Sequence, residues 1–516
     1  MNTVSTALPA SRVSLARLAF WLACAWAVGT IWLTPHLPQV DLPQHAGQVA
    51  LLRDLLAGTS PWAEVLRVNL LTPYLIGYLS LYGLSLAMPI ETAIALLYSV
   101  AFLAFVGACI SLRRQAGGDP RLDWLFLPAF FALPWRWGFL TFLVAMPIGL
   151  WLIREAYRLS EGRRLRDAVA VLLLGAALLF AHGLVFLYAV GLALLIAMTA
   201  SGQSWGQRLR AAAPALLLLL AFVLYKKLVI DREMQSAIGS DIWYFGGLRE
   251  RLYAFLVYPN SAQPREFPIA PLVAIAGWAA PWLLGLRPQP GLARKLPFLC
   301  TAAMMLVLPT FLFGATHFYE RFAMLLPVTY ALMFGAAPAA VRPAAPAWRA
   351  QAGLVCLALA AAVIFARETW QQLAFTPESR AADQALSAVP PQRRVLYAPV
   401  DRRSERTPLR DAFLHYPLWY QAQHGGLVEF NFATLLPQVV RFRELQGHVD
   451  PMFGWFAEKD FRWADHEAGG HDYLVLRSRE APTADMLAGR RCPLQPVAVQ
   501  PPWFVYRSAC AGGPRP

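Results

Sequence analysis

The stretch that decides the fold runs from Leu15 to His45. It reads LARLAFWLACAWAVGTIWL over residues 15–33 and TPHLPQVDLPQH over residues 34–45. The first part is long enough to cross a bilayer, because about 20 apolar residues in a helix span the hydrocarbon core. Arg12 and Arg17 stand at its start, and no small-residue cleavage site follows it. These features predict an uncleaved signal anchor with a cytoplasmic N-terminus, which places residues 34–45 on the outer face.

The whole chain of 516 residues continues this apolar character. Hydrophobic residues make up 57% and charged residues 15%, against roughly 45–50% and 25% in soluble proteins. The composition predicts an α-helical polytopic membrane protein and excludes soluble enzymes, collagens and disordered chains. Residues 1–366 hold 27 Lys and Arg against 15 Asp and Glu, whereas residues 367–516 hold 18 against 16. The basic surplus therefore orients membrane helices and does not indicate a nucleic-acid partner.

Eleven apolar runs are predicted to cross the membrane. They cover residues 15–33, 90–112, 122–134, 138–153, 168–181, 184–200, 211–225, 268–286, 296–314, 322–340 and 351–366. This scheme puts every basic loop cluster on the cytoplasmic side; the clusters lie within 113–121, 154–166, 208–210, 287–295 and 342–349. It requires that the apolar stretch Leu70–Ala87 does not cross, so we predict a helix that lies along the outer face there.

The long first loop, residues 34–88, and the tail, residues 367–516, then share the outer face. Composition changes sharply after Ala366. We therefore predict a transmembrane module over residues 1–366 and a small periplasmic α/β domain over residues 367–516. Within the tail, Thr376-Pro377-Glu378 predicts a helix start. Strands are predicted over residues 394–398, 472–477 and 503–507.

Six cysteines divide between the two parts of the chain. Four lie in apolar spans, whereas Cys492 and Cys510 lie in the tail. An oxidising exterior permits a disulfide, and closing a loop of this length stabilises a fold by about 3 kcal/mol in the chain-entropy model. We predict a disulfide between Cys492 and Cys510.

The first candidate site is Val40-Asp41-Leu42-Pro43-Gln44-His45. Pro43 suits the first turn of a helix that runs to Leu56, which brings Asp41 and His45 together at the helix start. The leucines of this helix (Leu51, Leu52, Leu55 and Leu56) are expected to face the bilayer. A carboxylate held at the membrane surface suits a catalytic base. The alternative is that Asp41 complements the helix dipole and His45 is an interfacial polar residue.

The second candidate site is the short outer loop that contains His317, Glu320 and Arg321 between two apolar spans. Arginine binds phosphate through two parallel hydrogen bonds, and these are strongest where water is scarce. We therefore predict Arg321 as a phosphate ligand. The alternative is that Glu320 and Arg321 only neutralise charges at a helix end.

Other polar residues are predicted at the outer ends of spans. They are Arg136, His182, Lys226, Lys227 and Arg232. The cations suit a phosphate, and the histidine suits a substrate hydroxyl. The alternatives are snorkelling of the lysines to lipid head groups, an aromatic-belt anchor for the arginine between two tryptophans, and a polar turn for the histidine.

The two candidate sites together resemble the C-type (GT-C) integral-membrane glycosyltransferases. The resemblance is carried by Asp41 followed by Pro43 and His45, and by Arg321-Phe322 with Pro327 further along; it covers residues 1–366. It implies a polyprenyl-phosphate sugar donor, surface helices in the first loop, a catalytic role for Asp41 and a lipid-phosphate role for Arg321. No acidic pair such as Asp-Asp, Asp-Glu or Asp-x-Asp surrounds Asp41, so a divalent metal is left open.

The predicted function is that of a bacterial inner-membrane glycosyltransferase. It moves a sugar from a polyprenyl-phosphate carrier to a periplasmic-face acceptor, which is a lipid, a glycan or a protein, and it contacts membrane lipids. A polymerase or ligase of lipid-linked glycans is one alternative, and an envelope scaffold is another. A transporter or flippase is disfavoured, because the spans are nearly free of the ionisable residues that such a path requires.

Overall fold

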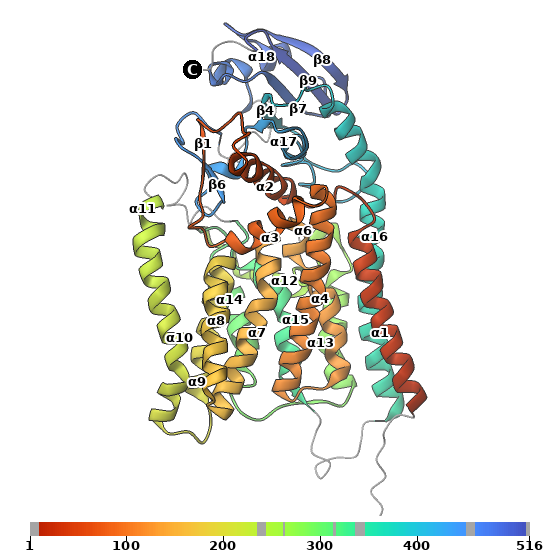
Figure 1. Ribbon diagram of the computed structural model, residues 1–516. Coiled ribbons are helices and arrows are strands. Elements are labelled where there is room, and N and C mark those ends of the chain that lie inside the picture. Colours follow the sequence, from red (N-terminus) through yellow and green to blue (C-terminus); the bar gives the residue numbers. More distant parts are fainter. Residues whose placement is uncertain are drawn as a thin grey trace, which may run out of the picture.

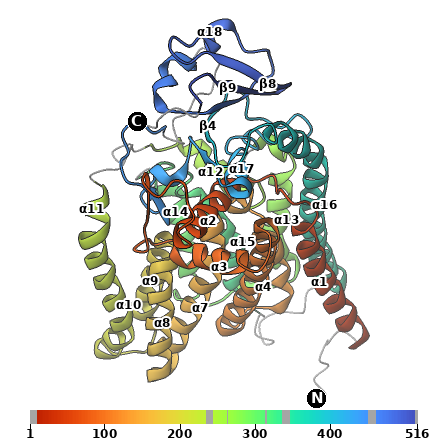
Figure 2. The same ribbon diagram turned by 45° about the horizontal axis from the view of Figure 1, so that its top comes forward.

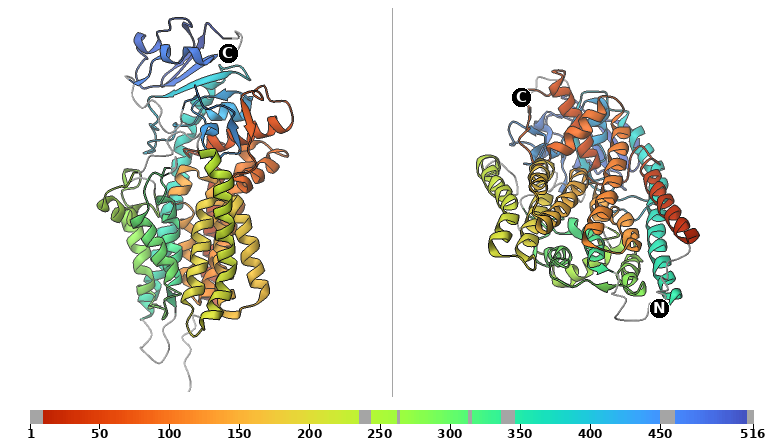
Figure 3. Two further views of the ribbon diagram at one scale, coloured as in Figure 1. Left: turned by 90° about the vertical axis from the view of Figure 1, so that its left-hand side faces the viewer. Right: turned by 60° about the horizontal axis from the view of Figure 1, so that its bottom comes forward.

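A computed structural model describes residues 10–234, 244–261, 264–312, 316–335, 346–449 and 460–511. It has two layers (Figure 1). The lower layer is a bundle of mostly long, roughly parallel helices. The upper layer combines the first loop with the tail and ends in a small sheet. The side view in Figure 3 shows the same stacking, with the sheet furthest from the bundle.

The bundle is built from helices of very different lengths. They are α1 (Ala10–Ile31), α4 (Ile90–Ala116), α5 (Phe126–Ala129), α6 (Leu133–Trp137), α7 (Leu140–Gly162), α8 (Leu165–Ala181), α9 (Gly183–Thr199), α10 (Trp205–Tyr225), α13 (Ala270–Leu283), α14 (Leu296–Val307), α15 (Leu325–Leu332) and α16 (Ala347–Leu386). By length and composition, four of the described helices are suited to cross a bilayer: α4, α7, α10 with its π-helical extension to Ile230, and α16.

Three predicted spans differ from the structure. The span predicted over 296–314 is shorter, because its helix α14 ends at Val307. Residues 122–134 do not form one helix: a 3-10 turn at Pro120–Leu125 is followed by α5 and α6. Proline lacks the N–H of a helix interior, so the prolines at 128 and 134 favour short pieces here. The span predicted over 322–340 consists of a 3-10 helix at Glu320–Met324, the short α15 and strand β3 (Phe334–Gly335). Residues 313–314 and 336–340 of the predicted spans lie outside the described residues.

The basic loop clusters within 113–121, 154–166, 208–210 and 287–295 lie at one end of the bundle, the lower end in Figure 1, and Arg342 of the last cluster lies outside the described residues. There Arg294 pairs with Glu161 at 2.9 Å and donates a hydrogen bond to the carbonyl of Gln115. Arg113 pairs with Asp123 at the same end. Three of the predicted clusters therefore meet, as expected of loops on one side. The helix α3 (Leu75–Ser85) has 11 residues, or about 16 Å, too short to cross a bilayer.

The upper layer contains the remaining helices and strands. The helices are α2 (Leu42–Leu56), α3, α11 (Asp231–Met234), α12 (Leu248–Val257), α17 (Leu418–His424) and α18 (Ala484–Leu487). The strands, apart from β2 (Arg287–Pro288) and β3 at the lower end, are β1 (Leu66–Val68), β4 (Arg394–Pro399), β5 (Leu427–Val428), β6 (Val440–Phe442), β7 (Tyr473–Arg477), β8 (Leu494–Gln500) and β9 (Trp503–Ser508). The tail strands predicted from the sequence correspond to β4, β7 and β9.

The five-stranded sheet has the order β5-β4-β7-β9-β8. Strands β5, β4 and β7 are parallel, and β9 and β8 add antiparallel. Alternate residues of a strand face opposite sides, and here Leu396 and Leu474 belong to a small outer core, whereas Val395 and Val475 join the core that continues into the bundle. Cys492 and Cys510 form a disulfide at the edge of the sheet, with Cα atoms 5.3 Å apart.

The first loop and the tail are joined by backbone pairing. Strand β1 of the loop pairs antiparallel with β6 of the tail, and α2 packs on α17 (Figure 2). The prediction that the leucines of α2 face the bilayer is wrong: Leu51 and Leu52 are buried in the protein, Leu55 is half-buried, and Leu56 alone of the four is exposed. The reason is that the tail folds back over this helix and covers its apolar side.

The helix α16 joins the two layers. It runs without a break over 40 residues beside α1 (Figure 3), so residues 366 and 367 lie within one helix. The helix start predicted at Thr376-Pro377-Glu378 is wrong, because α16 passes through it. Pro377 leaves the backbone carbonyl of Leu373 without its helical donor; one position earlier, the hydroxyl of Thr376 donates to the carbonyl of Gln372 at 2.9 Å. Continued packing on both sides of the proline maintains the helix.

Candidate active site

Asp41 lies at the upper end of the bundle, immediately before α2. Its backbone N–H donates to the carbonyl of Trp137 at 2.8 Å, which ties the first loop to the end of α6. The side chain is buried and makes no capping hydrogen bond to α2. A carboxylate at this position is expected to cap the helix. Since Asp41 does not do so, its carboxyl group remains available for another partner.

The turn after α6 allows this close approach. Gly138 has a φ of +76°, and a Cβ there would lie 3.0 Å from the backbone nitrogen of Leu42. Any other residue would be strained by the left-handed conformation and would also push the Asp41 segment away. Glycine is therefore required where α6 meets the start of α2.

His415 of the tail lies beside the Asp41 carboxylate. The Nε2 atom of His415 lies 3.6 Å from Asp41 Oδ1. Gln44 determines the tautomer of this histidine. Its Oε1 accepts from the N–H of Phe432, so its Nε2 donates to the carbonyl of Phe430 and, at 3.1 Å, to His415 Nδ1. His415 Nδ1 is thus an acceptor, and its proton is on Nε2, directed toward Asp41.

A second histidine is held in the opposite tautomer. The hydroxyl of Tyr78 donates to Gln438 Oε1, so it accepts a hydrogen bond from His45 Nδ1, 2.8 Å away. The Nε2 atom of His45 therefore carries a lone pair. His45 and His415 present one acceptor and one donor nitrogen, respectively, at this site.

Arg321 is also at this end of the bundle. Its guanidinium lies 4.0 Å from the centre of the Phe139 ring, and it donates to the carbonyls of Thr316 and His317. Residues 137–139 thus contact Asp41 on one side and Arg321 on the other. Arg321 is buried, and among the described residues no carboxylate lies within ion-pair distance of it. A buried cation without a counterion is ready to bind an anion.

The other two residues of the predicted outer loop lie beside Arg321. The ring of His317 packs on Trp137 at 4.2 Å, and its Nδ1 lies 3.8 Å from Glu320. Glu320 is buried, and its Oε2 has no hydrogen-bond partner among the described residues. Within the same part of the chain, no ion pair joins Glu320 to Arg321.

His182 joins the same group. It lies between α8 and α9, buried against Tyr74 and Phe142. Neither ring nitrogen has a hydrogen-bond partner in the part of the chain that the structure describes. The charge of Arg321 acts on both His182 and His45. An unpartnered buried imidazole is costly unless a ligand supplies the missing bond, so His182 fits a substrate contact better than a polar turn.

Burial controls the protonation of Asp41 and of the two histidines, His45 and His415. Burial raises the pKa of Asp41 to about 7, although the charge of Arg321 acts in the opposite direction. Burial lowers the pKa of His45 to about 3, and Arg321 adds to this effect. Burial also lowers the pKa of His415 to about 3. Asp41 is therefore the group that exchanges a proton near neutral pH, and both histidines are neutral there.

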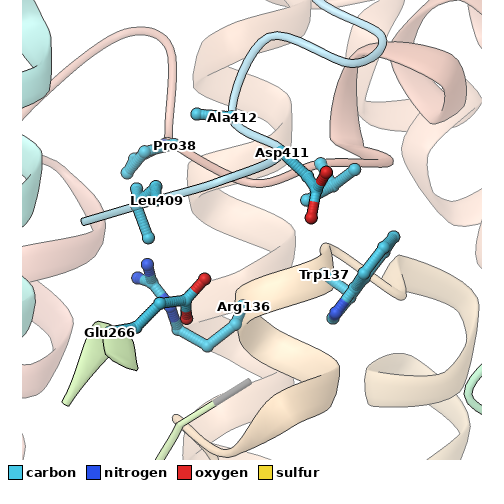
Figure 4. A pocket seen from close by; sticks show the side chains of 8 residues that line it. Pro38, Arg136, Trp137, Glu266, Leu409, Asp411 and Ala412 are labelled. Carbon is cyan, nitrogen blue, oxygen red and sulfur yellow. The ribbon is translucent and has the colours of Figure 1, made fainter. Parts of the chain in front are cut away.

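Arg136 lies on the pocket side of α6. Its Nη1 pairs with the buried Glu368 at 3.2 Å. Together with Trp137, Glu266 and Asp411 it lines a pocket, here called the Arg136 pocket, whose wall includes Val40 (Figure 4). Figure 4 shows Arg136 beside Glu266 on one side and Asp411 near Trp137 on the other. Arg136 is thus a buried pocket residue and does not act as an anchor in an aromatic belt.

Three predicted phosphate ligands are separated from these residues. Lys226, Lys227 and Arg232 lie at the upper end of α10 and in α11, at the edge of the bundle (Figure 1), and are exposed. Lys226 pairs with Asp231 at 2.6 Å. The structure therefore does not bring these cations to Asp41, and Arg321 is the cation that it places there.

A metal ion was left open by the sequence. Within the described ranges, no group of three or more His, Cys, Asp and Glu side chains is arranged to hold one. The carboxylate whose charge acts on Asp41 is that of Asp411, and Asp411 itself pairs with Arg402 at 2.5 Å.

Several residues of the site were not predicted. They are Tyr78, Glu266, Asp411, His415 and Gln438. The tail residues among them are far from Asp41 in sequence, so spacing carries no signal for them. One signal was present in α2: Asp41, Gln44, His45 and Gln48 form a polar stripe at helical spacing, which indicates a polar partner for that face.

No protein-family model and no curated protein matches the chain. Two solved structures match over nearly the whole length. ArnT from Cupriavidus metallidurans bound to undecaprenyl phosphate has a TM-score of 0.55 and 14% identity, covering 97% of this chain and 99% of that one. ArnT in the apo state has a TM-score of 0.58 and 14% identity, covering 98% and 100%. At 14% identity this likeness shows the fold alone: the chain shares the ArnT fold over nearly its whole length, in agreement with the helical membrane fold that the resemblance implies.

Proposed function

We propose that the chain is a GT-C glycosyltransferase of a bacterial inner membrane. It takes a sugar from a polyprenyl-phosphate carrier and transfers it to a hydroxyl-bearing acceptor at the periplasmic face. In this orientation the upper layer is periplasmic, and the basic loops at the lower end are cytoplasmic. The solved relative with this fold was crystallised with undecaprenyl phosphate, which supports a carrier of that class.

One observation carries this proposal: Arg321, which is buried and has no carboxylate partner among the described residues, packs on Phe139, while the backbone of the buried Asp41 is bonded to Trp137 two residues away, and the charge of Arg321 acts on the Asp41 carboxyl group. Arg321 suits the carrier phosphate, with His182 as a neighbouring polar contact. Asp41 takes the proton of the acceptor hydroxyl as the acceptor oxygen bonds to the anomeric carbon. The bond from that carbon to the phosphate oxygen breaks, and Arg321 stabilises the departing phosphate.

The histidines position the base in this scheme. His415 Nε2 lies 3.6 Å from Asp41 Oδ1, where it limits the orientations that the carboxyl group can take. Both His415 and His45 are neutral, so neither competes with Asp41 for the acceptor proton. The tail thus contributes directly to the site, because His415 comes from it.

The proposed function is tested with purified full-length protein in nanodiscs. Polyprenyl phosphates loaded with labelled pentose, hexose or amino sugar are incubated with an envelope lipid extract, with and without a chelator. We expect label to move to the extract and bare polyprenyl phosphate to be released. If no loaded carrier releases its sugar and bare undecaprenyl phosphate does not bind, the proposal is wrong. The chelator arm decides whether a divalent metal is needed.

The pH dependence of transfer follows from Asp41. A base must be deprotonated, so we expect kcat/KM to fall about tenfold per pH unit below about 7 and to level off above it. The contribution of Asp41 to folding stability changes with pH in the opposite direction to the rate. Its raised pKa favours the neutral form in the folded protein, so its contribution to stability is present below about pH 4 and is lost as pH rises through about 7. A pH–rate profile without a group near 7 would remove Asp41 from the role of base.

A further inference from the structure

His36 is a buried histidine of the first loop, five residues before Asp41, and it is 3% exposed. Its Nδ1 lies 2.9 Å from the hydroxyl of Tyr416 and 3.2 Å from Asp383 Oδ2. Its ring stacks on Trp419, with ring centres 4.4 Å apart. One side chain of the first loop therefore contacts the tail at two residues and α16 at a third.

The hydrogen bond between His36 and Tyr416 has a defined direction. The hydroxyl of Tyr416 donates its single hydrogen to Asp383 Oδ1 at 2.9 Å or to the carbonyl of Ser379 at 3.0 Å, and a carboxylate or carbonyl oxygen can only accept. The hydroxyl therefore accepts from His36 Nδ1, which must carry a hydrogen. The imidazolium and the Nδ1–H tautomer of the neutral ring both carry one there, so this contact does not depend on the charge of His36.

The other ring nitrogen of His36 faces α4 and α17. Its Nε2 lies 3.2 Å from Gln423 Nε2 and 3.8 Å from Glu91 Oε1, and Gln423 donates to Glu91 at 2.6 Å. Glu91 lies in the first turn of α4, whereas Gln423 lies in α17. Groups from the bundle, from α16 and from the tail thus surround His36, and their contacts fix α17 relative to the bundle.

The turn at residues 415–419 connects these contacts to the proposed base. Backbone hydrogen bonds close this turn, among them one from the N–H of Trp419 to the carbonyl of Tyr416 at 3.0 Å. Tyr416 and Trp419 contact His36, whereas His415 of the same turn lies 3.6 Å from the carboxylate of the base. Because the turn is hydrogen-bonded within itself, a displacement at His36 would also displace His415.

The first loop presents both of its contacts with this turn from one short segment. The hydroxyl of Thr34 donates to the carbonyl of His36 at 3.2 Å, and the N–H of Asp41 donates to the carbonyl of Trp137 at 2.8 Å. Both ends of the segment are therefore fixed, and the turn is held against it at two points. Tail residues cover Asp41 here, so the burial that raises the pKa of Asp41 to about 7 depends on the position of the turn.

We propose that His36 is a positioning residue for Asp41: through Tyr416 and Trp419 it holds the 415–419 turn, and with it His415, against the base. The inference rests on the proposed function, because that function makes Asp41 the base. His36 touches neither donor nor acceptor in this scheme. It acts by keeping water away from Asp41 and by limiting the orientations of its carboxyl group.

The test uses full-length protein in nanodiscs and three variants. His36→Leu removes the donor to Tyr416, and Tyr416→Phe removes the acceptor. His36→Asn is the conservative variant, because its amide places an N–H donor where His36 has Nδ1. His424→Leu is the matched control, since His424 is an exposed histidine of α17.

Two assays report on Asp41 in each variant. One is the pH dependence of the rate of sugar transfer. The other is the pH dependence of modification by a hydrophobic carbodiimide, which reacts with the protonated form of a carboxyl group and is located on Asp41 by mass spectrometry. The second assay needs no sugar transfer. Binding of bare undecaprenyl phosphate and the melting temperature are recorded as well.

We expect His36→Leu and Tyr416→Phe to lower the rate at least tenfold, because small displacements at a catalytic base are costly. The pH midpoint of Asp41 should fall by at least one pH unit in both assays, because the displaced turn admits water to a buried carboxyl group. The double variant should lose no more than either single variant, since both remove one contact. His36→Asn should restore the midpoint, and His424→Leu should match the wild type. All variants should bind bare undecaprenyl phosphate within twofold of the wild type.

The inference is wrong if His36→Leu keeps the wild-type midpoint, whatever its rate or melting temperature. A merely structural histidine would lower the folded fraction without changing the surroundings of Asp41. It is also wrong if the midpoint falls as far in His36→Asn as in His36→Leu. Failure of the proposed function gives a different result: the wild type transfers no sugar, while carbodiimide modification still reports the midpoint of Asp41 in every variant.

Discussion

Asp41→Asn is expected to reduce the rate of sugar transfer about 10³-fold, within the range that a general base contributes. Asparagine has nearly the same shape as aspartate but accepts no proton at neutral pH. Burial raises the pKa of Asp41 to about 7, which is where a base has both a large ionised fraction and a strong affinity for a proton. The rate is measured as release of bare polyprenyl phosphate from a labelled donor under single-turnover conditions.

The fold of this variant should be intact. Asp41 caps no helix through its side chain, and its backbone bond to Trp137 does not depend on the carboxylate. Its melting temperature at pH 8 should equal or exceed that of the wild type, because the buried charge is gone. Asp54→Asn, near the other end of α2, is the matched control and should keep the wild-type rate. A near-normal rate in Asp41→Asn would remove Asp41 from the chemistry.

Much of the site's location was predictable from the sequence. The alternation of basic loops put Asp41 and Arg321 on the same face, and the structure has both at the upper end of the bundle. The tail strands were predictable because β4, β7 and β9 are short runs of branched and aromatic residues. These features depend on local sequence and on charge counts, which need no knowledge of long-range contacts.

The rest depends on contacts between distant parts of the chain. His415 reaches Asp41 only because Gln44 binds the backbone at Phe430 and Phe432. A hydropathy pattern does not distinguish leucines that contact lipid from leucines that are covered by protein. For this reason α2 was predicted to lie on the membrane surface. Glu266 shows the same limit: its sequence context is an ordinary polar loop, and only the fold places it opposite Arg136.

The hydropathy of the sequence also did not reveal where the helices break. A hydropathy window reports how apolar a segment is, not whether it is continuous. Residues 122–134 are apolar because they are buried among other helices, and burial does not require an unbroken helix. Conversely, Pro377 suggested a helix start, but a hydroxyl one residue earlier binds a carbonyl of the preceding turn. The prolines at 128 and 134 are a local signal for the break at 122–134 that a hydropathy window does not weigh, whereas the local signal at Pro377 gave the wrong helix boundary.

Arg321→Ala is expected to weaken the binding of bare undecaprenyl phosphate about 100-fold. A charge-assisted hydrogen bond contributes roughly 1.5–3 kcal/mol, and arginine makes two to one phosphate. Because no described carboxylate pairs with Arg321, removing it leaves no buried anion behind. Arg321→Lys should weaken binding less, about tenfold, since it keeps the charge but loses the planar fork. Affinity is measured by titration into protein held in nanodiscs.

The exposed Arg232 is the matched control for this prediction, and it was itself a candidate phosphate ligand. The structure places it in α11 at the edge of the bundle, so Arg232→Ala should bind within twofold of the wild type. Arg321 also donates to the carbonyls of Thr316 and His317. Equal melting temperatures for Arg321→Lys and the wild type would show that the loss of phosphate affinity does not come from the loss of these structural bonds. The opposite result would be that Arg321→Ala binds undecaprenyl phosphate normally and Arg232→Ala does not. The phosphate site would then lie at α11, and residues 137–139 would not link the base to the phosphate.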